Sequence, residues 1–478
     1  MNSVANYIGG RFVPAACGRT VPVESPWDGA ALATIPRSDA TDVEAAVSAA
    51  RAAMNGPWGA MSTAERADLL DAAASAIDAD KDRWAWLEAR DAGKTITSAR
   101  SLDIPRAIAN LRFFAGLARQ SSTPSFETAT AWHQTVRRPL GVVGLITPWN
   151  LPLYLLTWKL APALAMGNAV VAKPSEFTPL SADALAHLFQ GLGLPPGAFN
   201  VVHGLGAEAG APLTAHRDVD GISFTGGTAT GAEVGATTSR RFAKLSLELG
   251  GKNPTVIFED APLDAAVAGA VRAGFTNTGQ ICLCGSRLFV HASIADAFIP
   301  KFLDAVRALR SGDPSDPTTQ VGALISAAHL DKVRGYVALA QQEGGRVLVG
   351  GDRPPGVPDG GHYLAPTVID GLSATCRTAT EEIFGPVVTV HRFRTEDELH
   401  AAVDGVPYGL AANLWTADLA RAHRVAARIR AGVVWVNTWL ERDLRTPFGG
   451  LGASGVGREG GTWSLDFFSE LRSVTVAK

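Results

Sequence analysis

Short β-branched runs alternate with Ala-rich helical segments along most of the 478-residue chain. In the first half, the runs at residues 142–146, 169–172, 200–203 and 221–224 are separated by helical periodicity at 180–192 and 206–215. The same alternation resumes after residue 248 and continues to residue 437. Strands that alternate with helices predict parallel sheets with helical connections. The pattern therefore predicts an α/β fold with two open parallel α/β domains.

Two segments do not follow this alternation. Residues 123–139 alternate polar and apolar side chains without helix signals, which is typical of an exposed hairpin, and residues 470–476 are typical of a strand. Separate hairpins and tails often make subunit contacts, although a plain surface loop fits the same pattern.

The charge pattern limits the possible partners. The net charge is −3, only 19% of the residues are charged, and no basic run occurs, so neither nucleic acid nor a membrane surface is expected as a partner. Residues 139–158 carry no formal charge and are long enough to suggest a membrane span. Pro148, Asn150 and Pro152 interrupt them, however, which instead predicts a buried strand, a loop and a helix through residue 160.

The cysteines indicate a reducing compartment. Cys17, Cys282, Cys284 and Cys376 have neither the paired spacing of a zinc site nor the density of a disulfide scaffold. Cys282 and Cys284 together lack the remaining ligands of a metal site, so no metal is expected. The first residues show no basic region followed by an apolar stretch, so no signal peptide is expected and a cytoplasmic location is predicted.

Two candidate catalytic residues lie among glycines and small polar residues. Cys282 belongs to the segment GQICLCGS and Glu248 to the segment LELGGKNP. A thiol with a separate carboxylate is typical of covalent catalysis assisted by a base. Taken alone, Cys282 could equally be a buried apolar cysteine and Glu248 a surface charge, so the interpretation depends on the other motifs.

Several such motifs follow one another along the chain: PWNLP at 148–152, KPSE at 173–176, FTGGTATG at 224–231, EEIFGP at 381–386 and PFGG at 447–450. In order and spacing, together with the Glu248 and Cys282 segments, they resemble the NAD(P)-dependent aldehyde dehydrogenase superfamily over essentially the whole chain. The resemblance implies an aldehyde dehydrogenase-like fold. It implies a Rossmann-like cofactor-binding domain at residues 1–122 and 140–248 and a catalytic domain at residues 249–455. Residues 123–139 and 462–478 would form a small β oligomerisation element of a homo-dimer or homo-tetramer.

The resemblance also implies a reaction sequence for a small-molecule aldehyde. The Cys282 thiolate would form a thiohemiacetal, whose oxyanion would accept hydrogen bonds from Asn150 and from the Cys282 backbone N–H. Hydride transfer to NAD would leave a thioester on the sulfur, and Glu248 would activate the water that hydrolyses it. The same carboxylate is the candidate for helping to deprotonate the thiol. A CoA-acylating variant is disfavoured because Glu248 supplies this base.

The cofactor would be bound without the usual G-x-G-x-x-G fingerprint, which is absent from a first βα unit. Gly226, Gly227 and Gly231 instead mark a strand-to-helix turn whose backbone N–H groups can meet a pyrophosphate, although such a turn can also lack a ligand. The resemblance implies that Lys173 and Glu176 hold the adenosine ribose. Since Glu176 would repel a 2′-phosphate, NAD is favoured over NADP.

At the nicotinamide end, the resemblance implies that Trp149, Glu382 and Phe384 contact the cofactor; without it, Glu382 and Phe384 would be read as surface charge and core. The chain departs from the family pattern at two positions. Gly227 stands where Ser is usual, which could loosen pyrophosphate binding, and Gly452 stands where Lys is usual, which puts a local salt bridge or subunit contact in doubt.

The segments at 102–108, 439–450 and 457–461 resemble the 2-hydroxymuconic and 2-aminomuconic semialdehyde dehydrogenases. Arg442 falls where related enzymes place an apolar or aromatic wall of the substrate pocket. An unpaired buried charge is costly, and a substrate carboxylate would supply the missing partner. Arg106 is the expected second contact.

The same segments place Trp158 on the apolar part of the pocket, with core packing as the alternative. For Arg442 the alternative is an ion pair with Glu441 or Asp443. The predicted function is NAD-dependent oxidation of a carboxylate-bearing semialdehyde of the muconic type. A general aromatic or aliphatic aldehyde dehydrogenase, and a catalytically silent binding protein on the same fold, are the two alternatives.

Overall fold

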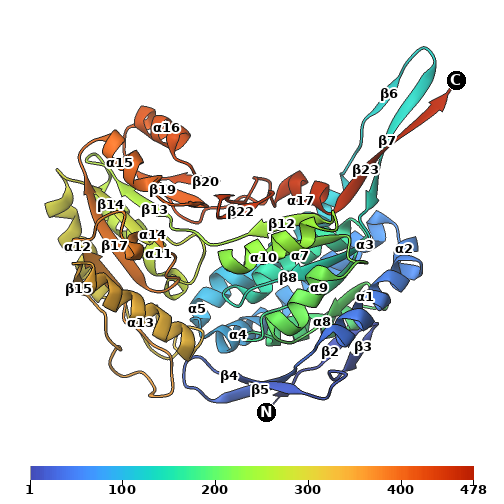
Figure 1. Ribbon diagram of the computed structural model, residues 1–478, viewed down its shortest axis with the longest axis horizontal. Helices are drawn as coiled ribbons and strands as arrows, with labels where there is room; N and C mark the ends of the chain where they lie inside the picture. Colours follow the sequence, from blue (N-terminus) through green and yellow to red (C-terminus); the bar gives the residue numbers. More distant parts are fainter. Residues whose placement is uncertain (1) are drawn as a thin grey trace.

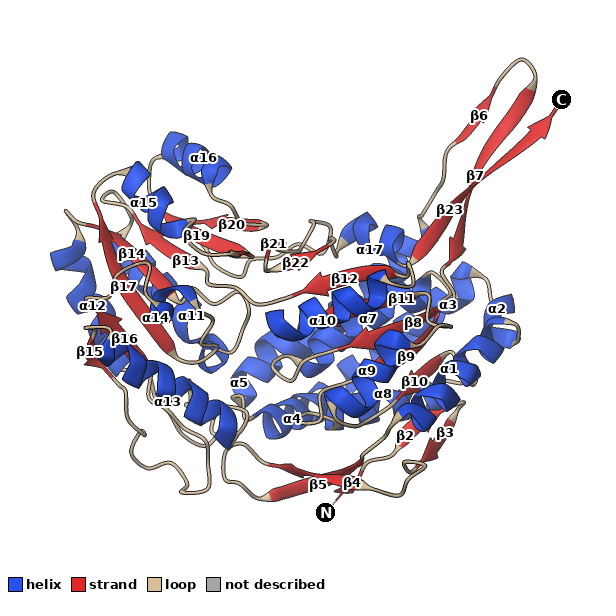
Figure 2. Ribbon diagram, viewed as in Figure 1, coloured by secondary structure: helices blue, strands red, loops and turns tan. Residues whose placement is uncertain are grey.

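Two large sheets dominate the computed structural model, which describes residues 2–478 (Figure 1). Helices pack on the faces of both sheets, and a thin β arm projects from the side of the first sheet (Figure 2). The predicted α/β class with parallel sheets is confirmed. Within residues 2–478, the structure contains no helix with the length and apolar character needed to cross a membrane.

The first sheet has eight strands in the order β22-β12-β11-β8-β9-β10-β2-β3. The strands from β12 to β10 are parallel, while β22 at one edge and β2 and β3 at the other are antiparallel to their neighbours. Their bounds are Asn6–Ile8 (β2), Arg11–Val13 (β3), Val142–Ile146 (β8), Ala169–Lys173 (β9), Phe199–Val201 (β10), Gly221–Thr225 (β11), Lys244–Glu248 (β12) and Gly455–Val456 (β22).

The uncharged segment forms the predicted strand, loop and helix. Strand β8 is followed by a loop and then by α7 (Pro152–Ala165), which extends five residues beyond the expected end at residue 160. Pro162 lies inside α7, where its missing N–H removes only one helical hydrogen bond near the end of the helix. The other helices beside this sheet are α8 (Leu180–Gly191), η2 (Gly206–Gly210), α9 (Ala211–Ala215) and α10 (Thr228–Ser239), so the helix expected at 206–215 starts with a π turn.

Most of the N-terminal segment is helical. Capping boxes at Asp39 and Ser62 start α1 and α3, because each side chain accepts a hydrogen bond from an exposed backbone N–H group of the first turn. The elements are α1 (Ala40–Met54), α2 (Pro57–Ala60), α3 (Thr63–Ala79), α4 (Lys81–Ala92), α5 (Ile96–Ser98), η1 (Ala99–Asp103) and α6 (Ile104–Arg119). Helix α6 packs against both α3 and α7.

The second sheet has seven strands in the order β15-β16-β17-β14-β13-β19-β20, and only the edge strand β15 is antiparallel. The strands are β13 (Pro254–Ile257), β14 (Arg287–His291), β15 (Arg346–Val349), β16 (Thr367–Asp370), β17 (Val387–Phe393), β19 (Ala411–Trp415) and β20 (Val433–Val436). The helices are α11 (Leu263–Phe275), η3 (Thr276–Gly279), α12 (Ala295–Arg307), α13 (Ala327–Gln342), α14 (Arg377–Thr380), α15 (Glu396–Val403) and α16 (Leu419–Arg428).

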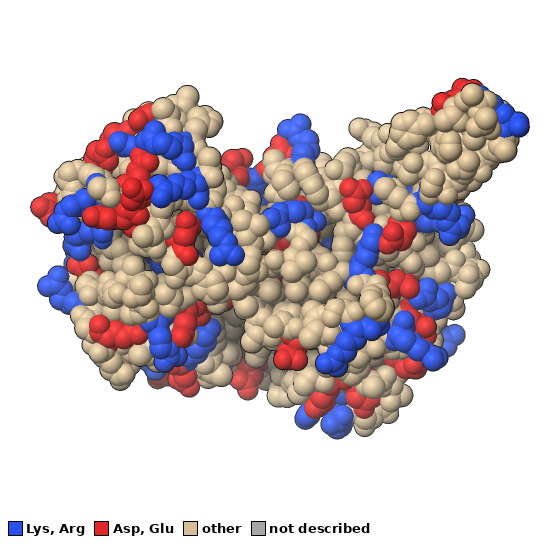
Figure 3. Space-filling view, turned by 45° about the horizontal axis from the view of Figure 1, so that its top comes forward, with Lys and Arg blue, Asp and Glu red and all other residues tan. Residues whose placement is uncertain are grey.

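The predicted hairpin and C-terminal strand together form the arm, a three-stranded antiparallel sheet of β6 (Ser125–Glu127), β7 (Ala131–Pro139) and β23 (Ser469–Ala477). Much of its surface is free of charged side chains in the view of Figure 3, apart from the region near its tip. The short strands near the N-terminus were not predicted, because runs this short carry little periodicity. The remaining elements are β1 (Asn2–Ser3), β4 (Thr20–Glu24), β5 (Ala31–Pro36), β18 (Tyr408–Gly409), β21 (Leu451–Gly452) and α17 (Gly461–Phe467).

Candidate active site

Three hollows surround the predicted site residues. The thiol cavity, of about 240 Å³, is lined by Cys282, Asn150 and other residues. The long cleft, of about 760 Å³, shares Trp149 with the thiol cavity and runs along the carboxyl ends of β8, β9 and β11. The arginine pocket, of about 550 Å³, is lined by Arg106 and Arg442, among others. Ligands in open α/β sheets commonly bind at the carboxyl ends of the strands, so this arrangement is that of a binding site.

Cys282 lies in the loop between η3 and β14 and is half-buried. Asn277 and Thr278 adopt left-handed conformations, with φ of 51° and 58°, and turn the chain sharply just before the thiol. Burial raises the pKa of the Cys282 thiol above its ordinary value, and the charges of Glu248 and Glu382 raise this pKa further. In the structure as it stands, the thiol therefore favours its protonated form.

Asn150 is fixed to the same loop. Its Nδ2 donates a hydrogen bond to the Gln280 carbonyl at 2.8 Å, and its own carbonyl accepts one from Asn277 Nδ2 at 3.1 Å. The amide nitrogen carries two hydrogens, so one remains for a ligand in the thiol cavity. Asn150 and Cys282 thus line the same small cavity, and hydrogen bonds tie Asn150 to the loop that carries Cys282.

Glu248 is the last residue of β12 and is 4% exposed. Neither of its carboxyl oxygens has a hydrogen-bond partner among residues 2–478. Burial raises the pKa of Glu248 well above its ordinary value, and the charge of Glu459 adds to the shift, while Lys159 and Arg442 oppose it. A buried carboxyl group without partners is a candidate acid or base, because its protonation state is poised by its surroundings.

Sequence reasoning missed the polar pair behind Glu248. Lys159 is fully buried, and its Nζ donates to Glu459 Oε1 at 2.6 Å and to Ser223 Oγ at 2.7 Å. The sequence did carry a signal, because Lys159 is the only charged residue of α7. A charge in a helix this buried needs an ionic partner from another part of the chain.

The predicted adenosine-end residues line the long cleft. Lys173 Nζ and Glu176 Oε2 are 2.9 Å apart at its edge. Gly226 lines the long cleft and Gly227 lines the thiol cavity, and Gly227 has open space around it. Gly231 lies within α10 and contacts Leu249, where a Cβ atom would collide with the leucine side chain. Close packing therefore accounts for glycine at Gly231.

The nicotinamide-end residues meet at the thiol cavity. Gly251 N–H donates to Glu382 Oε1 at 2.9 Å, and Phe384 adopts a left-handed conformation with φ of 62°. Trp149 makes edge-to-face contacts with Phe384 and with His329, at ring-centroid distances of 5.4 and 5.3 Å. Sequence reasoning missed His329, whose Nε2 bonds the Phe384 carbonyl at 2.7 Å, because a histidine on a helix gives no local signal.

Arg442 is half-buried and has no ion-pair partner in the described part of the chain. Its Nη1 donates to the Tyr154 hydroxyl at 3.0 Å, and its guanidinium lies 3.9 Å from the ring centroid of Phe448. Asp443, a proposed alternative partner, pairs instead with Arg445 at 2.6 Å. The alternative of a local ion pair is therefore not supported by the geometry.

Arg106 lies close to Arg442 in the arginine pocket. Its Nη2 donates to the Arg442 carbonyl at 3.3 Å, and its guanidinium lies 5.6 Å from the ring centroid of Tyr154. Burial lowers the pKa of Arg106, and the charge of Arg442 lowers it further. An anion between the two guanidinium groups would reverse this unfavourable interaction.

Trp158 is placed differently from the other predicted substrate residues. It is 2% exposed and packs edge-to-face on Phe114, with a centroid distance of 5.7 Å. The Arg442 guanidinium lies 5.1 Å from its ring centroid. Trp158 is thus a core residue whose ring packs against the Arg442 guanidinium, which matches the core-packing alternative.

The family of the chain follows from comparison with known proteins. A family model described as "Aldehyde dehydrogenase family" matches residues 12–474. The chain belongs to the aldehyde dehydrogenase family. It is 46% identical over 477 residues to the 2-aminomuconic semialdehyde dehydrogenase of Danio rerio, covering 98% of this chain and 97% of the relative. It is 45% identical over 484 residues to the 2-hydroxymuconic semialdehyde dehydrogenase of Pseudomonas sp. (strain CF600), covering 100% of both chains.

A solved structure shares the aldehyde dehydrogenase fold along the whole chain. PnpE from Pseudomonas sp. WBC-3 is 43% identical, with a TM-score of 0.97 over 100% of this chain and 98% of that chain. The predicted membership of the family, and with it the prediction of an aldehyde oxidoreductase, is confirmed. Within residues 2–478, no cluster of His, Cys, Asp and Glu side chains could hold a metal ion.

Proposed function

We propose that this aldehyde dehydrogenase oxidises a semialdehyde that carries a remote carboxylate, of the muconic semialdehyde type, to the corresponding acid with NAD. Its relatives named 2-aminomuconic and 2-hydroxymuconic semialdehyde dehydrogenases support this substrate class. The observation that carries the proposal is Arg442, a half-buried cation that points into an open pocket without an ionic partner among the described residues.

The NAD site fits the residues that line the long cleft. Glu176 and Lys173 lie together at the edge of this cleft, Glu382 lines the adjoining thiol cavity, and the open space beside Gly227 leaves the start of α10 accessible to a pyrophosphate. A related structure is PnpE in complex with nicotinamide adenine dinucleotide, 43% identical with a TM-score of 0.97 over 99% of this chain and 97% of that chain. NAD, when bound, would supply the hydride acceptor.

Glu248 would first take the proton of the Cys282 thiol and release it to solvent, and the resulting thiolate would attack the aldehyde carbon and form the thiohemiacetal. The second N–H of Asn150 and the backbone N–H of Cys282 would donate hydrogen bonds to the resulting oxyanion, which lowers the barrier because negative charge develops there. After the carbon is oxidised, an acyl group remains on the sulfur. Glu248 would then take a proton from the water that hydrolyses this thioester, a role that its buried and unpartnered carboxyl group supports.

The far end of the substrate would lie in the arginine pocket. The Arg442 and Arg106 guanidinium groups would donate hydrogen bonds to the carboxylate, and Phe448 and Trp158 already hold Arg442 in place by stacking. A guanidinium whose position is fixed loses little conformational entropy when it binds an anion, so the ionic contact adds to affinity.

Replacing Arg442 by alanine is expected to lower kcat/KM for carboxylate-bearing aldehydes by about 10- to 100-fold, the usual worth of a hydrogen bond to a charged group. The loss should appear mainly in KM, because the carboxylate is bound in both the ground and transition states. Steady-state kinetics with acidic aldehydes and with neutral aldehydes of equal length measure the effect.

Arg428→Ala is the control for this substitution. Arg428 is exposed, pairs with Asp397 at 2.7 Å and does not line the arginine pocket, so its loss should leave both substrate classes unchanged. Equal kinetics of Arg442→Ala on acidic and neutral aldehydes would instead favour a general aromatic or aliphatic aldehyde dehydrogenase.

The arm is proposed to join subunits of a homo-dimer or homo-tetramer, as the oligomerisation element at 123–139 and 462–478, beside a cofactor domain (1–122 and 140–248) and a catalytic domain (249–455). Its large apolar side chains are unusually exposed, at 62% for Phe126, 46% for Trp132 and 55% for Leu471. A cytoplasmic location is part of the same proposal, and the four free cysteines support it.

Replacing Trp132 by arginine should therefore shift the assembly toward smaller species. The charge would have to be buried in the subunit contact without a partner, which is costly. Sedimentation velocity of the full-length chain measures the assembly, and an unchanged sedimentation coefficient would show that the arm face around Trp132 makes no subunit contact.

A further inference from the structure

The loop that carries the nucleophile is held through its carbonyl groups. We call residues 282–284 the thiol loop. Asn253 Nδ2 donates to the Cys282 carbonyl at 2.7 Å and to the Cys284 carbonyl at 3.0 Å. The intervening Leu283 carbonyl accepts a hydrogen bond from Trp439 Nε1 at 3.0 Å. Side chains from two distant segments thus fix three consecutive peptide groups around Cys282.

Trp439 comes from the segment that also carries Arg442, residues 437–446, which we call the arginine loop. Two non-glycine residues with left-handed backbones, Asn437 with φ of 54° and Leu440 with φ of 65°, flank the pair Thr438 and Trp439. Such conformations are unfavourable and persist only where the surroundings enforce them. They turn the Trp439 ring inward, where it is 1% exposed.

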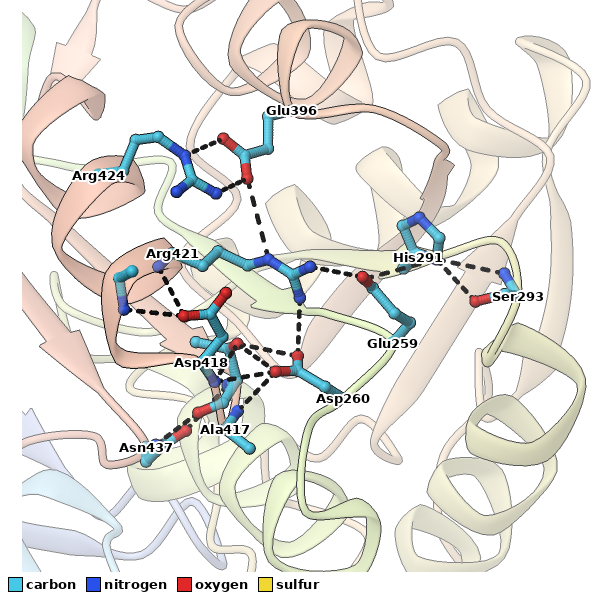
Figure 4. A network of polar contacts seen from close by, with 12 residues as sticks. Glu259, Asp260, His291, Ser293, Glu396, Ala417, Asp418, Arg421, Arg424 and Asn437 are labelled. Atoms are coloured by element: carbon cyan, nitrogen blue, oxygen red, sulfur yellow. Dashed lines mark hydrogen bonds and ion pairs between the residues drawn. The ribbon is translucent and has the colours of Figure 1, made fainter.

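The base of the arginine loop is fixed independently of the thiol loop. Asn437 exchanges two hydrogen bonds with the Thr416 backbone, at 3.0 and 2.8 Å. Asp260 in turn accepts hydrogen bonds from the Thr416 hydroxyl and from Arg421 Nη1, both at 2.8 Å (Figure 4). This network anchors the loop at β20, and Trp439 links the loop directly to the thiol loop through the Leu283 carbonyl.

We propose that Trp439 is a positioning residue that sets the spacing between the Cys282 sulfur and the Arg442 guanidinium, and so selects semialdehydes by the distance between their two ends. Arg442 follows Trp439 by three residues, and its guanidinium is fixed on Phe448 at 3.9 Å. A substrate bound at both ends reacts fast only if both contacts form without distortion. This inference rests on the proposed carboxylate-bearing substrate.

Trp439→Phe tests the link, because it removes the indole N–H and keeps an aromatic ring in the core. The substrates are unbranched semialdehydes of increasing chain length and neutral aldehydes of the same lengths. The wild type should show a sharp optimum of kcat/KM among the acids. In Trp439→Phe, kcat/KM at this optimum should fall about tenfold and the profile should flatten, because misplacement of one end of the substrate slows the reaction. Neutral aldehydes should change less than about twofold, because they are held at one end only.

Trp58→Phe is the matched control. Trp58 is also 1% exposed, and its Nε1 donates to the Asn168 carbonyl at 3.2 Å, far in sequence from both loops. Trp58→Phe and Trp439→Phe should each lower the midpoint of thermal unfolding, because each loses a buried hydrogen bond, but Trp58→Phe should keep the wild-type chain-length profile. If Trp439→Phe lowers kcat/KM equally for acidic and neutral aldehydes, or keeps the sharp optimum, the positioning role is overturned.

The same panel measured with Arg442→Ala separates this inference from the proposed function. If Arg442→Ala loses activity only on the acids while Trp439→Phe keeps the wild-type profile, only the role of Trp439 is wrong. If Arg442→Ala has the kcat/KM values of the wild type on both acidic and neutral aldehydes, the proposed carboxylate site is wrong. The proposed selection by Trp439 is then overturned as well.

Discussion

Replacing Cys282 by alanine is expected to lower kcat for every aldehyde by on the order of 10⁴-fold or more, as the loss of a covalent nucleophile commonly does. No neighbouring group can take its place: Cys284 is buried, and its sulfur contacts the Thr276 carbonyl at 3.8 Å. The formation of reduced nicotinamide, followed by its absorbance, measures the loss.

Cys284→Ala is the control for this substitution, since it removes a second buried sulfur two residues away. Its kcat should stay within about threefold of the wild type, because its side chain fills space without reaching the aldehyde. If Cys282→Ala kept substantial activity, or if Cys284→Ala were the inactive variant, the assignment of the nucleophile would be wrong.

The second large effect is expected for Glu248→Gln, which should lower kcat by about 10²- to 10⁴-fold, the range attributed to general acid–base groups. Thiohemiacetal formation should suffer less than thioester hydrolysis, because the water depends directly on the Glu248 carboxylate. Rapid mixing should therefore show a burst of about one reduced nicotinamide per subunit, followed by slow turnover. A full loss without any burst would mean that the step limited by Glu248 precedes formation of the acyl group.

The pH dependence of stability gives an independent check on Glu248. Burial raises the pKa of its carboxyl group above the value in the unfolded chain, so the folded protein favours the protonated form. This contribution is fully present below the ordinary pKa and is lost as the pH rises through the raised pKa. Glutamine is always neutral, so the thermal midpoint of Glu248→Gln should exceed that of the wild type by a margin that grows with pH. A margin that shrinks with pH would contradict the raised pKa.

The sequence predicted the chemistry better than the packing. Cys282 and Glu248 are recognisable because glycines and small residues surround them in short motifs, whereas the strand that ends at Glu248 was not predicted. Trp158 and Gly231 belong to equally clear motifs, but the structure gives both a packing role. Which face of a buried helix meets a pocket depends on tertiary contacts that periodicity does not contain.

The residues that sequence reasoning missed act across long separations in the chain. Lys159 meets Glu459, and Trp439 meets Leu283, each through a single contact between segments more than a hundred residues apart. Local sequence patterns indicate secondary-structure propensity and hydrophobic periodicity only within one helix or strand. A pairing of this kind becomes visible once the fold has brought the segments together.

The pairing of β12 with β22 has a consequence for folding during synthesis. Glu248 pairs with Gly455 of β22, and the Leu249 N–H bonds the Ser454 carbonyl at 3.0 Å, so the strand that bears the base is completed by residues near the C-terminus. Near the opposite edge of the same sheet, β2 and β3 come from residues far earlier in the chain. Because pairing over such sequence distances closes late, nascent chains should remain inactive until β22 has been translated. A chain that stops before β22 should therefore have the thiol but lack a properly seated base.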